Sequence, residues 1–157
     1  MKRLNRDYTF EYPINYNNYM FIIDAPIYKS LLFKKTIALG NLYFFETFLV
    51  AEFNEGVNID YDNFKEAAAA IKNQYGSKDF GFISNRIHSF SIVITDASKF
   101  NETFKNLKAY ATVTYSSFAS KVFEMENHFF NFNRKNFNDL SEAITWVEDS
   151  LKDNESV

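Results

Sequence analysis

The chain has 157 residues, of which 46% are hydrophobic and 24% charged, with a formal net charge of −3 and no cysteine. Such a length and composition predict one globular domain whose core forms without disulfides or a thiolate zinc site. The absence of a basic block argues against nucleic-acid binding, because neutralising phosphates needs clustered Lys and Arg.

Residues 1–33 form an extension that is rich in Tyr and Asn, carries both prolines and has no sustained hydrophobic period. We expect it to pack on the domain through its aromatic side chains, with one short strand near 19–23. The domain itself is predicted at 34–152. The last residues, 153–157, are expected to fray.

A β-hairpin is predicted at the start of the domain. A short strand at 35–39 is followed by a turn at Gly40 and Asn41. The β-branched and aromatic run after this turn divides into strands at 42–46 and 47–54. This part of the sheet is therefore expected to be antiparallel.

Strands and helices then alternate along the chain. A helix is predicted between Asp60, which can cap its first turn, and Gly76, which suits a helix end. Further strands are expected at 80–83, 109–115 and 129–132. The alternation predicts right-handed crossovers in an α/β fold. We expect a mixed sheet of about five strands, which opens with an antiparallel β-hairpin and continues as βαβαβα with helices packed on the sheet.

Helical periodicity predicts which side chains of the four helices face the core. After the first helix, the others are expected to begin at Thr95 or Asp96, at Ser116 or Ser117, and at the capping box that starts with Asp139. The predicted inward residues, in helix order, are Phe64, Ala68, Ile71 and Tyr75; Phe100, Phe104 and Leu107; Phe118, Val122 and Met125; and Leu140, Ala143, Ile144, Val147 and Leu151.

Three stretches occur in an order that matches a known family. They are FLVAEFNEGVNIDYDNF, which runs from a strand through a polar turn into a helix, FGFIS in the central strand, and NDLSEAITWV in the last helix. Together they resemble the STAS family, and within it the SpoIIAA-like branch, over roughly residues 35–151. The resemblance implies a regulatory module that is not an enzyme and works by binding a protein partner.

The resemblance also implies a phosphorylation switch at a serine near the start of the helix after the central strand. Ser98, which follows Asp96, is the candidate here, although the glycine of the family's motif is absent. Some SpoIIAA-like proteins resemble lipid carriers, which implies an apolar ligand as another possibility.

A polar loop follows the central strand. Ser84, Asn85 and Arg86 leave the strand at its carboxyl end, where ligand sites on open α/β sheets lie, and His88 and Ser89 come next. Asn offers a donor and an acceptor, and Arg offers a planar cationic fork. We therefore predict that the loop binds a small anion or an acidic side chain of a partner.

A purely structural role for this loop is the alternative. Asn85 can close a turn with its own side chain, and Arg86 can pair with Glu52 or Glu55.

Three hypotheses for function follow. The first is a cytoplasmic module that contacts a protein partner or a second copy of itself, with no membrane insertion, metal or cofactor. The second is a carrier of a small apolar or anionic ligand, which requires a cavity of several hundred Å³. The third is a small enzyme in which Arg86, His88 and Glu52 converge.

Overall fold

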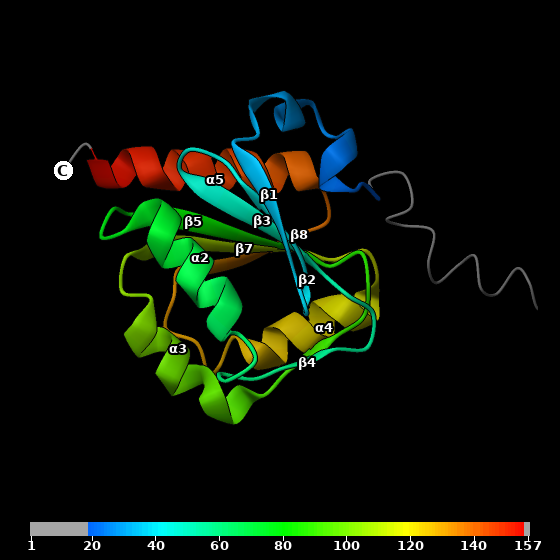
Figure 1. Ribbon diagram of the computed structural model, residues 1–157. Coiled ribbons are helices and arrows are strands. Elements are labelled where there is room, and N and C mark those ends of the chain that lie inside the picture. The colour runs from blue at the N-terminus through cyan, green and yellow to red at the C-terminus, as the bar shows by residue number, and fades with distance from the viewer. Residues whose placement is uncertain (1–18, 156–157) are drawn as a thin grey trace, which may run out of the picture.

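Six strands form one mixed sheet in the computed structural model, which describes residues 19–155 (Figure 1). In spatial order they are β1 (Phe33–Ile37), β2 (Gly40–Phe44), β3 (Phe48–Phe53), β5 (Phe80–Asn85), β7 (Leu107–Val113) and β8 (Arg134–Phe137). The first three strands pair antiparallel, and β3, β5, β7 and β8 pair parallel. The predicted α/β class with an antiparallel start is confirmed, with six strands rather than about five.

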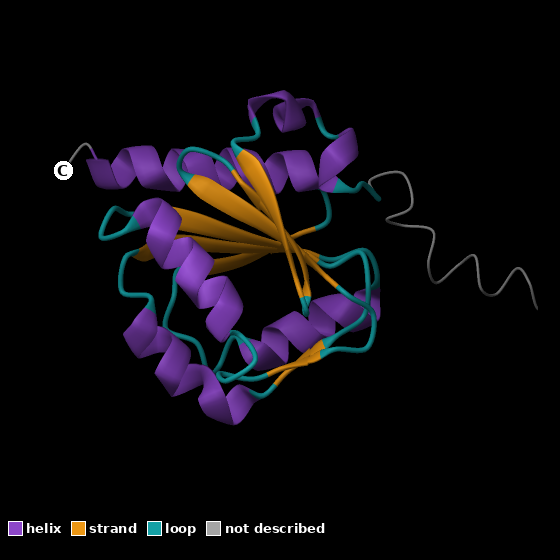
Figure 2. Ribbon diagram, in the orientation of Figure 1, coloured by secondary structure: helices purple, strands orange, loops and turns teal. Residues whose placement is uncertain are grey.

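Helices cover both faces of this sheet (Figure 2). The longer helices are α2 (Lys65–Tyr75), α3 (Ala97–Thr103), α4 (Ser117–Glu126) and α5 (Leu140–Glu155). The shorter elements are the 3₁₀ turns η2 (Ile22–Asp24), η3 (Pro26–Ser30) and η4 (Ile94–Asp96), and the paired segments β4 (Asn58–Ile59) and β6 (Ser91–Ile92). Each parallel strand lies beside the strand before it, so right-handed crossovers place α2, α3 and α4 on one face. The last helix, α5, lies on the opposite face with η2 and η3.

Central strands of the sheet are buried on both faces. Every residue of β3 and β5 is buried, as expected for strands covered by helices on either side. Gly81 lets α5 approach closely, because a Cβ atom there would lie 2.3 Å from Cγ1 of Val147. The two layers thus form one hydrophobic cluster beneath α2 and α3 and a second beneath α5.

Three local predictions are wrong. The segment 129–132 is not a strand, because β8 begins at Arg134 and the preceding Phe130 and Phe132 pack against the core from a loop. The turn predicted at Gly40 lies one step earlier, at 38–39. Gly40 instead opens β2 with φ of 147°, and a Cβ atom there would lie 2.5 Å from the Glu52 carbonyl oxygen. Finally, Leu107 opens β7 and is not part of α3.

The extension predicted at 1–33 is described only from residue 19. The strand expected near 19–23 is absent, and this stretch leads into the 3₁₀ turn η2. Ile22 and Ala25 are buried in the cluster beneath α5. At the other end, α5 continues to Glu155, beyond the frayed end expected from 153, and residues 156–157 lie outside the described part.

The predicted inward faces are confirmed for most helices. The five predicted residues of α5 are buried, as are Phe64, Ile71 and Tyr75 along α2 and Phe100 and Phe104 along α3. Asp60 caps a turn before α2 rather than its first turn, since its Oδ1 accepts a hydrogen bond from the Asn63 N–H.

The predicted inward face of α4 is wrong. Phe118 and Met125 are exposed, whereas Phe123 and Glu126 of the same helix are buried. The predicted N-cap is confirmed, because Oγ of Ser116 accepts a hydrogen bond from the Ala119 N–H.

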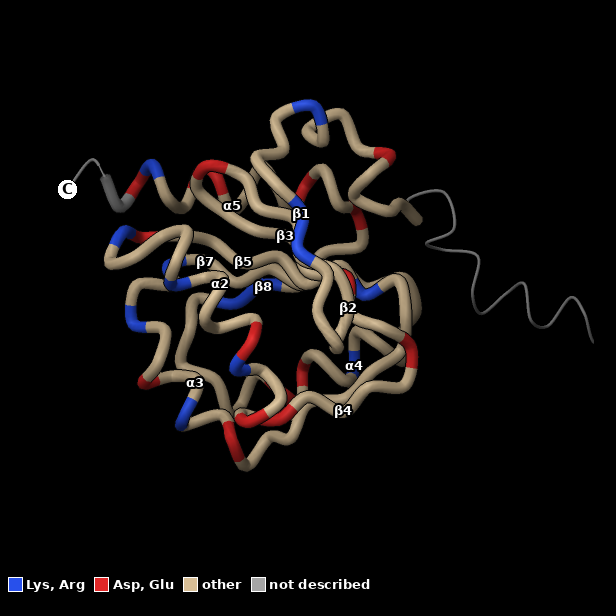
Figure 3. Tube along the Cα trace, viewed as in Figure 1, with Lys and Arg blue, Asp and Glu red and all other residues tan. Residues whose placement is uncertain are grey.

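Charged residues of both signs are spread along the described chain (Figure 3). Within residues 19–155, no group of three His, Asp or Glu residues is placed to hold a metal ion. None of the helices described is long and apolar enough to cross a membrane.

Candidate functional site

The polar residues at the carboxyl end of β5, Ser84 and Asn85, are buried. Asn85 is hydrogen-bonded inside the protein, whereas Oγ of Ser84 has no hydrogen-bond partner within the described chain. The Asn85 amide donates to Oε2 of Glu52 at 2.7 Å and to the Met20 carbonyl oxygen at 2.9 Å. The Asn85 carbonyl oxygen accepts a hydrogen bond from the Tyr115 hydroxyl at 2.7 Å. Asn85 therefore ties the segment before η2 to the sheet.

Glu52 completes this buried network. Its Oε2 also accepts a hydrogen bond from the Ile22 N–H at 2.7 Å. Burial raises the pKa of the Glu52 carboxyl, although the hydrogen bonds from Ile22 and Asn85 act in the opposite direction. Burial also raises the pKa of the Tyr115 hydroxyl above its ordinary value, at which the group is already a protonated donor at neutral pH.

Arg86 lies in a separate buried charge cluster with Glu126 and Arg134. Arg86 Nη2 lies 2.7 Å from Glu126 Oε1, and Arg134 Nη2 lies 3.4 Å from the same oxygen. The side chains of Arg86, Glu126 and Arg134 are 5%, 5% and 0% exposed. The expected pairing of Arg86 with Glu52 or Glu55 is wrong, because its carboxylate partner comes from α4.

Aromatic rings surround both guanidinium groups of this cluster. The Arg134 guanidinium carbon lies 4.5 to 4.8 Å from the ring centres of Tyr110, Phe123 and Phe130. The Arg86 guanidinium carbon lies 4.9 Å from the ring centre of Phe90. Within the described chain, Nε of Arg86 and both Nε and Nη1 of Arg134 have no hydrogen-bond partner. The cluster thus holds two cations, one anion and three unpartnered donors.

A groove of about 290 Å³ opens where β5 and β7 end. One wall is the loop after β5, which contributes Arg86, the exposed His88 and Ser89, and Phe90. The other wall is the first two turns of α4, and Tyr19 and Tyr115 also line the groove. The Ser89 N–H is held by Oε1 of Glu55, which fixes the loop. This groove has the position that the sequence predicts for a ligand site on a parallel sheet.

Ser98 does not belong to this groove. It is exposed near the start of α3 and lies at a separate surface hollow with Tyr61 and Lys99. Its phosphorylation stays a prediction.

The residues of the enzyme hypothesis have different partners. Glu52 binds Asn85, Arg86 binds Glu126, and no hydrogen bond joins Glu52, Arg86 and His88 within the described chain. A shared acid–base arrangement of the kind that general catalysis needs is therefore not formed by these three side chains.

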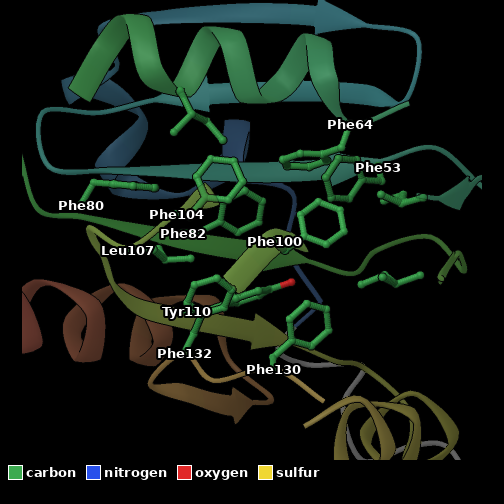
Figure 4. A pocket seen from close by; sticks show the side chains of 13 residues that line it. Phe53, Phe64, Phe80, Phe82, Phe100, Phe104, Leu107, Tyr110, Phe130 and Phe132 are labelled. Atoms are coloured by element: carbon green, nitrogen blue, oxygen red, sulfur yellow. The ribbon is translucent and has the colours of Figure 1, made fainter. Parts of the chain in front are cut away.

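A second hollow lies on the same face of the sheet, beneath α2 and α3 (Figure 4). Its walls are apolar and mostly aromatic, and include Phe82 and Tyr110 from the sheet, Phe64 and Phe100 from the helix side, and Phe130 from the loop before β8. The cavity between these side chains has a volume of about 50 Å³.

The small volume of this hollow limits what it can hold. An apolar cavity that binds benzene measures roughly 150 Å³. The aromatic hollow is a third of that size and falls short of the several hundred Å³ that the carrier hypothesis requires. A ligand would enter only if one or more of the rings moved.

No protein-family model matches this chain, and comparison with curated proteins and with solved structures also yields no match.

Sequence reasoning missed Glu126, Arg134 and the exposed face of α4. A second helical stripe was present in the sequence at Ala119, Phe123 and Glu126. A glutamate such as Glu126 is typical of the exposed face of a helix. Its burial depends on two arginines that are distant in sequence, and the helical pattern alone contains no sign of them.

Proposed function

We propose that this protein is a STAS-like binding module that is not an enzyme and acts through protein–protein contacts at the exposed apolar face of α4. One observation carries the proposal. Phe118, Met125 and the following Phe129 are 77%, 62% and 50% exposed, and they recur at helical spacing with the half-buried Val122. Large apolar side chains that gather on one surface mark interaction sites in soluble proteins.

The size of this face favours a transient partner protein over a permanent dimer. At about 200 Å² for each large side chain, the three exposed residues offer on the order of 400 Å². A stable interface buries about 800 Å² on each partner. A partner that presents an apolar surface the length of three helical turns would cover the face. The antiparallel start and parallel continuation of the sheet support the STAS-like part of the proposal.

Site-specific photocrosslinking tests the contact. A photoreactive phenylalanine at position 118 should give one defined adduct in host cells, and Met125→Glu in the same chain should remove it. The matched control places the same group at Thr145, an exposed residue of α5 on the opposite face. Equal crosslinking yields at positions 118 and 145 would reject the proposal. An adduct whose yield is unchanged by Met125→Glu would also reject it. An adduct of twice the chain mass would replace the transient partner with a second copy.

A small apolar ligand is the second candidate function, and the apolar lining of the hollow, rather than its small volume, favours it. The hollow's walls offer almost no polar atom, so an apolar guest would lose little by entering. Native mass spectrometry of the purified protein, beside a denatured control, tests this candidate. A non-covalent adduct that is lost on denaturation and is absent from a Phe82→Trp variant, which fills the hollow, would support it. If the native and denatured samples both show only the mass of the chain, the ligand-binding candidate is rejected.

A further inference from the structure

The charge cluster of Arg86, Glu126 and Arg134 lacks one negative charge. Two guanidinium groups share a single carboxylate, and all three side chains are at least nine-tenths buried. Aromatic faces at 4.5 to 4.9 Å offset part of the cost of burying the second cation. They do not neutralise it, because a buried charge is strongly disfavoured without a counter-charge. A bound anion would complete the balance.

Arg86 connects this cluster to the groove at the carboxyl edge of the sheet. It lies in the groove wall, and its Nε has no hydrogen-bond partner in the described chain. Each Nη atom uses one N–H for Glu126, which leaves the second N–H of each Nη and the buried Nε–H for a ligand.

The other polar groups of the groove also favour negative charge. The N-terminus of α4 lies in the groove wall, and the amide N–H groups of Ser117 and Phe118 have no acceptor within the helix. His88 is exposed at the rim. None of the described side chains that line the groove is acidic. Apart from the hydroxyl groups, the polar side chains that line the groove are therefore Arg86 and His88.

The remaining walls are apolar. Tyr19, Phe90, Phe118 and Val122 face the same space. The groove volume of about 290 Å³ is at the lower end of the range for small-molecule sites. A ligand that fits these walls has a small aromatic or aliphatic body.

We infer that this groove binds a small carboxylate with an apolar body, whose carboxylate lies between Arg86 and the N-terminus of α4. A singly charged ligand matches the single missing charge, whereas a phosphate ester near neutral pH would exceed it. The site shares Phe118 and Val122 with the proposed docking face, but Met125 and Phe129 of that face do not line the groove.

Isothermal titration of the full chain with matched probe pairs tests this inference. Benzoate and octanoate carry the carboxylate, and benzamide and octanamide are their neutral counterparts. We expect saturable binding of at least one carboxylate, at least ten-fold tighter than its amide. Equal affinity within a pair, or no saturable binding of either carboxylate at 10 mM (about the weak limit of such titrations), would overturn the inference.

Variants locate the site. Arg86→Met should weaken carboxylate binding at least ten-fold, while Glu126 retains Arg134 as its counter-ion. Phe118→Ala should weaken it several-fold, and Phe129→Ala, in the turn after α4 and outside the groove, should leave it unchanged. Unchanged affinity in both the Arg86 and Phe118 variants would reject the site.

Two further measurements keep the test decisive. Circular dichroism shows whether Arg86→Met folds. If it does not, amide chemical shifts of the wild-type chain are followed as carboxylate is added. The changes must centre on residues 86–90 and 116–122, and changes centred elsewhere would reject the site. Met125→Glu separates the two proposals, because it should abolish the crosslink from position 118 and leave carboxylate binding intact.

Discussion

Removing the Glu126 carboxylate should destabilise this protein more than any other single change to its buried charges. In Glu126→Ala, Arg86 and Arg134 lose the one carboxylate among residues 19–155 that pairs with them. Breaking a buried ion pair by removing one partner costs about 3–5 kcal/mol, because a charge is left uncompensated. Here two like charges remain, so the upper part of that range is expected. For a domain of this size the loss corresponds to a fall in Tm of roughly 6–20 °C.

Two control variants separate the charge argument from general damage to α4. Glu124→Ala removes an exposed carboxylate two residues away and should change the free energy of unfolding by less than about 0.5 kcal/mol. Arg86→Met leaves the Glu126–Arg134 pair balanced, so its cost should be only about 1–2 kcal/mol.

Urea unfolding provides the assay, with circular dichroism and the fluorescence of Trp146, the single tryptophan, as probes. The reasoning fails if Glu126→Ala lies within 1 kcal/mol, about the error of two such extrapolations, of the wild-type chain. It also fails if Arg86→Met proves more destabilising than Glu126→Ala.

Three other predictions concern single contacts. Because burial raises the pKa of the Glu52 carboxyl, its contribution to stability is present at acidic pH and is lost as the pH rises through the folded-state pKa. Glu52→Gln keeps an acceptor oxygen and should give a flatter dependence of unfolding free energy on pH, and a profile as steep as the wild type would contradict this. Ser116→Ala removes the N-cap of α4 and should cost about 1 kcal/mol in urea unfolding, whereas no change would show that water replaces the cap. Gly81→Ala places a Cβ atom against Val147 and should cost about 1–3 kcal/mol, and adding Val147→Ala should recover part of the loss. Additive losses in that double variant would refute the proposed clash.

Hydrophobic patterns predicted the fold class well because they depend on local chemistry. Strands such as 80–83 and helices such as α5 have side-chain periods that match the faces they bury. The segment 129–132 misled because aromatic residues favour strands mainly through packing. Phe130 and Phe132 obtain that packing from a loop, where they lie against the aromatic hollow.

Prediction of the candidate site was less complete. The position of a site beyond β5 follows from the rule that ligands bind at the carboxyl ends of parallel strands. The roles of Asn85 and Arg86 did not follow, because their partners Tyr115 and Glu126 are 30 and 40 residues away.

The amino-acid sequence by itself determined the alternation of strands and helices, the antiparallel start of the sheet and most inward faces, since each is set by neighbours within a few residues. Tertiary structure decided which face of α4 is buried. An isolated helix could bury either of two stripes, the apolar one at Phe118 and Met125 or the one at Phe123 and Glu126. The second is buried because Arg86 and Arg134 compensate the charge of Glu126 within a shell of aromatic rings. That choice exposes Phe118 and Met125, and with them the surface on which the proposed function depends.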